Sequence, residues 1–445
     1  MSLLIRGAVV PGSTEPGTAR DILIEGGRVG LVAPGIGAAR ASGADVVDAS
    51  GMAAVPGLVN AHAHSAMTLL RGAAEDMELG PWLSEAIWPR EARMSPEDIY
   101  WGTRLACQEM LRTGTTLCHD MYLDPRAVAE AARDSGMRYV AGYALIDGLD
   151  EARGEAQREA CDAFFAELPD YGSLVRFGLA AHSVYATCAE SLRYLGRLSS
   201  ERGLPLHVHL SETEAENRDC KASRGMSPTA YLDSLGALGP RTLAAHCLWL
   251  DERDWDILAE RGVTVAHNPV SNMKLASGPA FDYEAARSRG IRVLLGTDGA
   301  ASNNSLDLYA DAKIAGLLQK HHYRDPTRFP VGAILGAASK AGYAFFGADA
   351  GFAPAGAGSE GLLSEGFLSE GFLSEGAPAD IALIDLSKPG MSPVCDAAAN
   401  LVYAGAGAAV DTVIVEGRIV VERGRCRDEA TVLAEARARA ARIAG

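Results

Sequence analysis

The chain has 445 residues, of which 48% are hydrophobic and 22% are charged. These proportions are those of a globular protein with ample apolar material for a buried core, so they exclude a disordered or fibrous chain as the overall description. The 57 acidic residues outnumber the 41 basic ones and give a formal net charge of −16. This charge argues against a nucleic-acid partner, because binding phosphates needs a positive surface.

The first residues lack the apolar stretch of a signal peptide, and no window approaches the roughly 18 uninterrupted apolar residues of a membrane-spanning helix. Eight cysteines are scattered along the chain without a CxxC pair. In a chain of this length they are typical of reduced, buried thiols. We therefore expect a cytoplasmic protein with no membrane partner.

The N-terminal 54 residues carry short strand-like pieces broken by glycine and proline, namely Leu3–Val10, Asp21–Glu25 and Arg28–Val32. Residues 378–424 show the same pattern in Asp380–Leu386, Thr412–Val415 and Arg418–Glu422. Segments 1–54 and 378–424 are predicted to pair into one small β-sandwich. Segment 425–445 follows as a C-terminal helix over Glu429–Ile443.

Residues 55–350 alternate between β-branched or apolar runs and segments with helical spacing. The runs are Val55–His64, Thr113–Met121, Arg138–Asp147, Val175–Ser183, Leu204–Glu212, Thr242–Leu250, Val263–Asn272 and Val293–Gly299. The helical segments between them include Pro96–Arg112, Pro125–Ser135, Ala189–Arg202 and Asp251–Arg261. Eight such units favour an α/β fold with a (β/α)8 barrel. An open, doubly wound sheet shows the same alternation and stays an alternative at this point.

Residues 351–377 are of low complexity, and Ser359–Gly376 repeats a five-residue SEGFL-type unit. This period matches neither a helix nor a strand, so we expect an expanded surface loop. A partner-binding loop is the alternative. The GxGxxG pattern at Gly356–Gly361 does not connect a strand to a helix, so it does not predict a dinucleotide site.

Five polar residues stand at the ends of the predicted barrel strands: His62, His64, His209, His246 and Asp298. The carboxyl ends of barrel strands form the active-site face, and alternate residues of a strand point the same way. Taken alone, each histidine is more typical of a hydrogen-bonded core residue, and Asp298 could equally cap the helix that follows it. Together, on one face, they predict a metal site.

Several motifs resemble the amidohydrolase superfamily: Pro56–His64, His209–Glu212, Ala245–Cys247 and Gly296–Gly299. The segments His64–Gly72 and His267–Ala276 resemble its cytosine/guanine/adenosine-type deaminase branch. Within that branch, Glu75-Asp76, Trp82-Leu83 and Gly299–Asn304 resemble 5′-methylthioadenosine/S-adenosylhomocysteine deaminases. The resemblance covers nearly the whole chain apart from the repeat.

The resemblance implies one divalent metal per subunit, held by His62, His64, His209 and Asp298, with an open position for water. Zinc is the default, and iron, manganese or nickel fit the same ligands. Asp298 would take a proton from the water, Glu212 would protonate the ring nitrogen, and His246 would orient the attacking oxygen. A bridging lysine, as in binuclear relatives, is excluded because the first lysine is Lys221.

For the substrate, the resemblance places Glu91 on the ribose hydroxyls, His182 near the base and Arg153 on a homocysteine carboxylate. A second arginine for that carboxylate is missing within Gly142–Ala144, which weakens S-adenosylhomocysteine as the substrate. The expected reaction converts a 6-aminopurine nucleoside (methylthioadenosine, S-adenosylhomocysteine or adenosine) into its inosine analogue and ammonia. A homo-oligomer is a further family expectation.

Two alternatives remain at this stage. The first is a related hydrolase that acts on guanine, another aminopurine or a triazine. The second is a non-catalytic barrel that serves as a scaffold, although this chain keeps every expected ligand. The nucleoside reading depends chiefly on Glu91, since a carboxylate that accepts hydrogen bonds from a vicinal diol suits a nucleoside better than a free base.

Overall fold

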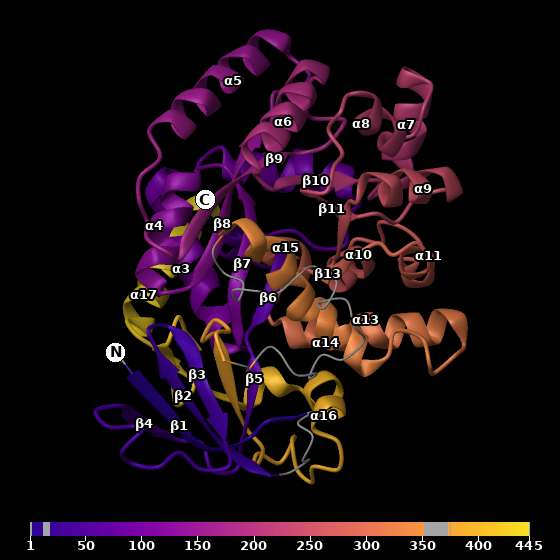
Figure 1. Cartoon of the computed structure of the whole chain (residues 1–445). Coiled ribbons are helices and arrows are strands. Elements are labelled where there is room, and N and C mark those ends of the chain that lie inside the picture. Colours follow the sequence, from indigo (N-terminus) through magenta and orange to yellow (C-terminus); the bar gives the residue numbers. More distant parts are fainter. Residues whose placement is uncertain (1, 12–17, 351–372, 374, 445) are drawn as a thin grey trace.

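The computed structural model describes residues 2–11, 18–350, 373 and 375–444 (Figure 1). Within them, the strands form two sheets, a parallel one in the middle of the chain and a mixed one built from both ends. Residues 351–372 and 374 lie outside the described residues. The predictions for the repeat loop and for Gly356–Gly361 therefore stay predictions.

The parallel sheet closes into a barrel, as predicted. Its strand order is β13-β12-β11-β10-β9-β8-β7-β6-β14, with β13 bonded to β12 and β14 bonded to β6. Only Gly296 and Thr297 separate β13 from β14, so these two pieces act as one eighth strand that closes the ring. The strands are β6 (Leu58–His64), β7 (Thr115–Tyr122), β8 (Arg138–Leu145), β9 (Val175–Ala181), β10 (Leu206–Leu210), β11 (Thr242–His246), β12 (Thr264–His267), β13 (Val293–Leu295) and β14 (Asp298–Gly299).

Helices surround the barrel, and the strands beneath them are almost continuously buried, as parallel strands covered on both faces are. The predicted helices are present as α3 (Pro96–Arg112), α4 (Pro125–Ser135), α6 (Ala189–Arg202) and α9 (Glu252–Arg261). Ser95 and Asp98 form a reciprocal capping box in front of α3, which explains its sharp start. The remaining helices are η1 (Ser65–Leu70), α1 (Leu79–Pro81), η2 (Trp82–Ile87), α2 (Trp88–Glu91), α5 (Glu151–Ala166), α7 (Glu214–Arg224), α8 (Pro228–Ser234), α10 (Pro269–Lys274), α11 (Tyr283–Ser288), α12 (Ala300–Asn303), α13 (Leu308–Tyr323), α14 (Val331–Ala338), α15 (Lys340–Ala350), α16 (Ala397–Tyr403), η3 (Ala406–Ala409) and α17 (Glu429–Ala444).

Two predicted strands run into another element of the structure, and several others are shorter than predicted, such as β11, which ends at His246 rather than Leu250. Val55 and Pro56 belong to β5 (Met52–Pro56) of the mixed sheet, because the hydrogen bonds change partner at Gly57: its N–H bonds Asp380, whereas that of Leu58 bonds Gly114 in the barrel. The predicted strand Val263–Asn272 ends at His267, and α10 follows. Proline lacks an N–H and has a helical φ, so Pro269 starts a helix rather than continuing the strand.

Both chain ends contribute to the mixed sheet, which lies below the barrel in Figure 1 and is called here the chain-end sheet. Its order is β18-β17-β16-β15-β5-β1-β2-β3, and β4 pairs with β1. It has its own buried core, which includes Ile22, Ile24, Ile381 and Leu383. Its other strands are β1 (Ser2–Val9), β2 (Ala19–Glu25), β3 (Arg28–Ala33), β4 (Asp45–Asp48), β15 (Ile381–Asp385), β16 (Val410–Val415), β17 (Arg418–Glu422) and β18 (Arg425–Cys426).

In the described part of the chain, none of the helices combines the length and the hydropathy needed to cross a bilayer. Six of the eight free cysteines are buried, as predicted. The prediction is wrong for Cys395, which is exposed, and for Cys426, which is half-buried. Cys395 lies in the irregular segment between β15 and α16, and Cys426 lies in the terminal strand β18, where little of the chain covers them.

A buried ion pair joins the barrel to the chain-end sheet. Nε of Arg138, at the start of β8, donates to Oδ2 of Asp380 at 2.6 Å, and both side chains are at most 4% exposed. The Tyr343 hydroxyl donates to the same oxygen at 3.0 Å, and the Glu416 N–H donates to the other at 2.8 Å. Asp380 therefore has both carboxylate oxygens satisfied while it holds the two sheets together.

We expect Asp380→Ala to lower the free energy of unfolding by about 3–5 kcal/mol, because the buried Arg138 guanidinium would lose the carboxylate that it contacts at 2.6 Å. Urea unfolding measures the loss. Glu25→Ala is the matched control, since Glu25 pairs with Arg40 on the surface, where both side chains are about half exposed. Equal losses in the two variants would contradict the role given to the buried pair.

Candidate metal centre

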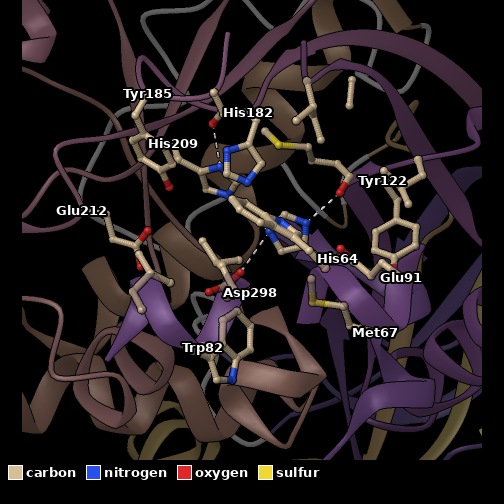
Figure 2. Close-up of a pocket in the computed structure, with 18 of the residues that line it drawn as sticks. His64, Met67, Trp82, Glu91, Tyr122, His182, Tyr185, His209, Glu212 and Asp298 are labelled. Atoms are coloured by element: carbon tan, nitrogen blue, oxygen red, sulfur yellow. Dashed lines mark hydrogen bonds and ion pairs between the residues drawn. The ribbon is translucent and has the colours of Figure 1, made fainter. Parts of the chain in front are cut away.

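Five side chains converge at the carboxyl ends of the barrel strands. His62 and His64 lie on β6, His209 on β10, His246 on β11 and Asp298 on β14. Oδ1 of Asp298 lies 3.2 Å from Nε2 of His62 and 3.3 Å from Nε2 of His64, and the Nε2 atoms of His64 and His209 are 3.2 Å apart. Figure 2 shows His64, His209 and Asp298 pointing toward one another. The strand-end pattern thus becomes one compact cluster of nitrogen and oxygen donors.

Hydrogen bonds on the far side of the rings direct the histidine lone pairs into this cluster. Nδ1 of His64 donates to the Met121 carbonyl at 2.7 Å, and Nδ1 of His209 donates to the His182 carbonyl at 2.7 Å. A carbonyl only accepts, so in the neutral rings both Nε2 atoms carry lone pairs, and these face each other. At this distance the two lone pairs repel each other unless a proton or a metal ion lies between them.

His62 completes the set. Its Nδ1 contacts Nε2 of His207 at 2.8 Å, while its buried Nε2 faces Oδ1 of Asp298 at 3.2 Å. Three imidazole nitrogens and one carboxylate oxygen are the donor types of a catalytic site for a divalent transition metal.

The protonation of the cluster is consistent with metal binding. Burial alone would raise the pKa of Asp298, but hydrogen bonds and charge from His62 and His64 hold it well below its ordinary value. Burial would lower the pKa of His64, yet the Asp298 carboxylate raises it to about 9. At neutral pH His64 therefore carries a proton beside the Asp298 anion, and a divalent ion would displace that proton, since metal ligands bind in their deprotonated forms.

The backbone is strained where these strands end. Ser211, His246, Cys247 and Asp298 all adopt positive φ angles of 49°, 73°, 52° and 62°. For residues other than glycine, each such conformation costs about 1–3 kcal/mol. Inter-strand hydrogen bonds hold it in place, among them Cys247 N–H to Leu210 and Leu248 N–H to Ser211. These backbone conformations turn side chains at the ends of β10, β11 and β14 toward the same point.

Glu212 lies beside the cluster as a buried carboxyl group. Its Oε2 is 3.8 Å from Nε2 of His246, and its Oε1 accepts a hydrogen bond from the Ser277 hydroxyl at 3.2 Å. Burial raises the pKa of Glu212, and the negative charge of Asp298 adds to this. A carboxyl group with a raised pKa can hold and deliver a proton near neutral pH.

A cavity of about 580 Å³ opens onto the cluster, a size typical of sites for small molecules. Of the predicted site residues, His64, His209, Glu212, His246, Asp298, Glu91, His182 and Arg153 line it, and His62 lies behind Asp298. In Figure 2, Glu91 and Glu212 stand on opposite sides of the histidines. Burial raises the pKa of Glu91, and hydrogen bonding with the Tyr122 hydroxyl opposes that shift.

Comparisons with known proteins agree with this geometry. The model of the amidohydrolase family matches residues 53–354. The chain belongs to this family. It is 43% identical to the 5′-deoxyadenosine deaminase of Methanoregula boonei over 89% of this chain and 86% of that one, and 41% identical to 5-methylthioadenosine/S-adenosylhomocysteine deaminase 1 of Archaeoglobus fulgidus over 86% of each. A zinc-bound adenosine deaminase structure from Xanthomonas campestris matches with a TM-score of 0.83 and 31% identity, over 99% of this chain and 98% of that one.

The sequence missed several residues of this amidohydrolase site. Asn272 and Ser271 lie on α10, within the motif His267–Ala276, which marked the segment but not the role of either residue. His207 lies two residues before His209 on β10, and this HxH pair was its signal, because alternate residues of a strand direct both rings to one face. Tyr122, at the end of β7, carried no signal.

We expect His209→Ala to weaken binding of a divalent metal by more than the roughly tenfold to hundredfold loss that outer-shell changes cause. Inductively coupled plasma mass spectrometry after dialysis against buffered zinc measures metal retention. His321→Ala, an exposed histidine on α13, is the control and should retain metal like the wild type. Unchanged retention in His209→Ala would contradict the metal centre.

Proposed function

We propose that this amidohydrolase is a metal-dependent hydrolytic deaminase that converts a 6-aminopurine nucleoside into its inosine analogue and ammonia. The observation that supports this most directly is that two carboxyl groups, the buried Glu212 and the half-buried Glu91, lie on opposite sides of one cavity, with the metal-type cluster between them. Relatives about 40% identical over most of their length are named deaminases of adenine nucleosides, which supports the same chemistry here.

In this proposal His62, His64, His209 and Asp298 hold a single divalent ion, with zinc as the simplest choice. The short distances from Oδ1 of Asp298 to Nε2 of His62 and His64, and the approach of the His64 and His209 Nε2 atoms, support this ligand set. When bound, such an ion lowers the pKa of a water toward about 7 and so supplies a nucleophile at neutral pH.

The protein's own residues then move the protons. Asp298, held as an anion, takes a proton from the attacking water. Glu212 delivers a proton to the ring nitrogen beside the amino-bearing carbon, which makes that carbon more electrophilic. His246, 3.8 Å from Glu212, orients the oxygen that adds to the carbon. Asp298 passes its proton to the amino group, the carbon–nitrogen bond breaks and ammonia leaves. The hydroxyl left on the carbon gives its proton back to Glu212, so that a carbonyl remains.

Glu91 supports a nucleoside rather than a free base. From α2, across the cavity from Glu212, its carboxylate can accept hydrogen bonds from the two ribose hydroxyls, which are donors in this pairing. Of the two expected arginines, Arg153 lines the cavity, but the second position falls on a wall that includes Ala144 and Ile146. We therefore favour substrates with a small, uncharged 5′ group over S-adenosylhomocysteine. Cytoplasmic location and homo-oligomerisation stay predictions.

Ultraviolet spectra test the reaction directly. Zinc-supplemented protein is mixed in parallel with 5′-deoxyadenosine, methylthioadenosine, adenosine and S-adenosylhomocysteine. We expect the adenine spectrum to change into that of hypoxanthine, fastest for the nucleosides with an uncharged 5′ group. No change with any of them, together with turnover of guanine or a triazine, would move the protein to the alternative substrate class.

Glu91→Gln should lower kcat/KM for nucleosides by roughly 10- to 100-fold, because hydrogen bonds to a charged group contribute about 1.5–3 kcal/mol. Steady-state kinetics on methylthioadenosine measures the change, and Glu85→Gln on the exposed side of η2 is the matched control. If Glu91→Gln behaves like the control, Glu91 does not hold the ribose.

A further inference from the structure

The short helix α10 and the residues after it contact three members of the site at once. The Ser271 hydroxyl donates to Oδ2 of Asp298 at 2.6 Å, and the Ser277 hydroxyl donates to Oε1 of Glu212 at 3.2 Å. Between them, Oδ1 of Asn272 lies 2.7 Å from Nδ1 of His246. All three side chains are buried. The seven residues from Ser271 to Ser277 therefore contact all three groups that the proposed function uses beside the metal: Asp298, Glu212 and His246.

The contact of Asn272 fixes where His246 carries its proton. Nδ1 of His246 lies 2.7 Å from the Asn272 oxygen and 3.4 Å from Nδ2 of Asn268. An amide oxygen only accepts hydrogen bonds, so the shorter contact favours a proton on Nδ1, which donates to Asn272. In the neutral ring Nε2 then has the lone pair, and this is the atom that faces Glu212 at 3.8 Å. The opposite tautomer would place a lone pair against the Asn272 oxygen and would direct an N–H into the cavity instead.

Ser271 has a comparable effect on Asp298. Its hydroxyl donates to Oδ2 of Asp298, and the Ser302 hydroxyl donates to the same oxygen at 3.1 Å. The other oxygen, Oδ1, is thereby left to face His62 and His64. The carboxylate is held in one rotation, with one oxygen bound by the protein and the other directed at the cluster.

The segment is itself anchored on both sides. The Trp249 indole N–H donates to the Ser277 carbonyl at 2.9 Å. At the last residue of α10, Nζ of Lys274 lies 2.5 Å from the Asn304 side-chain oxygen and 2.8 Å from a Glu75 carboxylate oxygen. These contacts tie α10 to three neighbouring loops, so its buried side chains keep fixed positions relative to the strand ends.

We propose that α10 is a positioning element and that Asn272 is the positioning residue for His246, setting both the tautomer and the orientation of the ring. This rests on the proposed function for the role of His246 in the reaction, although the tautomer itself is a property of the protein alone. Ser271 and Ser277 orient Asp298 and Glu212 in the same way.

Two variants of Asn272 test this. Asn272→Leu keeps the volume and removes the acceptor, and we expect kcat to fall by about 10²-fold or more, because a histidine in the wrong tautomer loses most of its catalytic effect. KM and metal content should stay as in the wild type. Asn272→Asp keeps an acceptor oxygen and should restore most of kcat. Met273→Ala, a half-exposed side chain on the same helix, is the control.

A second readout is independent of any substrate. In zinc-loaded protein labelled with ¹⁵N-histidine, the His246 ring signals, assigned with a His246→Gln variant, should report Nδ1–H in the wild type and in Asn272→Asp but not in Asn272→Leu. Should Asn272→Leu fail to fold, Asn272→Ala makes the same comparison. An unchanged tautomer in the acceptor-free variant would overturn the proposal, whereas the expected NMR change without deamination of any nucleoside would overturn the proposed function alone.

Discussion

The structure depends on one electrostatic constraint: histidine lone pairs and a carboxylate are brought together in a buried place. The Nε2 atoms of His64 and His209 are 3.2 Å apart with their Nδ1 protons committed to carbonyl groups, and the Asp298 carboxylate lies next to them. Without a proton or a metal ion between them, these groups would destabilise the barrel mouth, since each is removed from water. Such a cluster is typical of a binding site and not of a hydrophobic core.

Barrel closure makes this constraint possible. Asp298 reaches the histidines only because β14 pairs with β6. Two residues separate β14 from β13, which pairs with β12 on the other side of the ring. The break between the two pieces gives Asp298 a positive φ and turns its side chain inward. A continuous eighth strand would alternate its side chains regularly between the two faces of the sheet. The interruption is therefore a structural feature of the site.

Around the cluster, each chemically active group has its remaining polar atom held by a neighbour. His64 and His209 are held by carbonyl groups, His246 by Asn272, and Asp298 and Glu212 by serine hydroxyls. Groups fixed in this way need little reorganisation when charge develops during a reaction, which is a major source of catalytic power. In the proposed function, Glu91 and Arg153 on the opposite wall of the cavity select the substrate.

The sequence by itself determined the alternation of strands and helices, the pairing of strand-like pieces from both chain ends and the five polar residues at the strand ends. These features depend on local periodicity and on the rule that barrel strands end on one face. The sequence also determined the family, through motifs contiguous in the chain. Only the tertiary structure decided that Glu91 and Glu212 lie on opposite sides of one cavity and that Ser271, Asn272 and Ser277 hold three site residues. The run Val263–Asn272 reads as a strand because its composition is apolar, whereas Pro269 begins a helix there. Such contacts join residues more than twenty positions apart, and local propensity carries no information about which side chains meet at that distance.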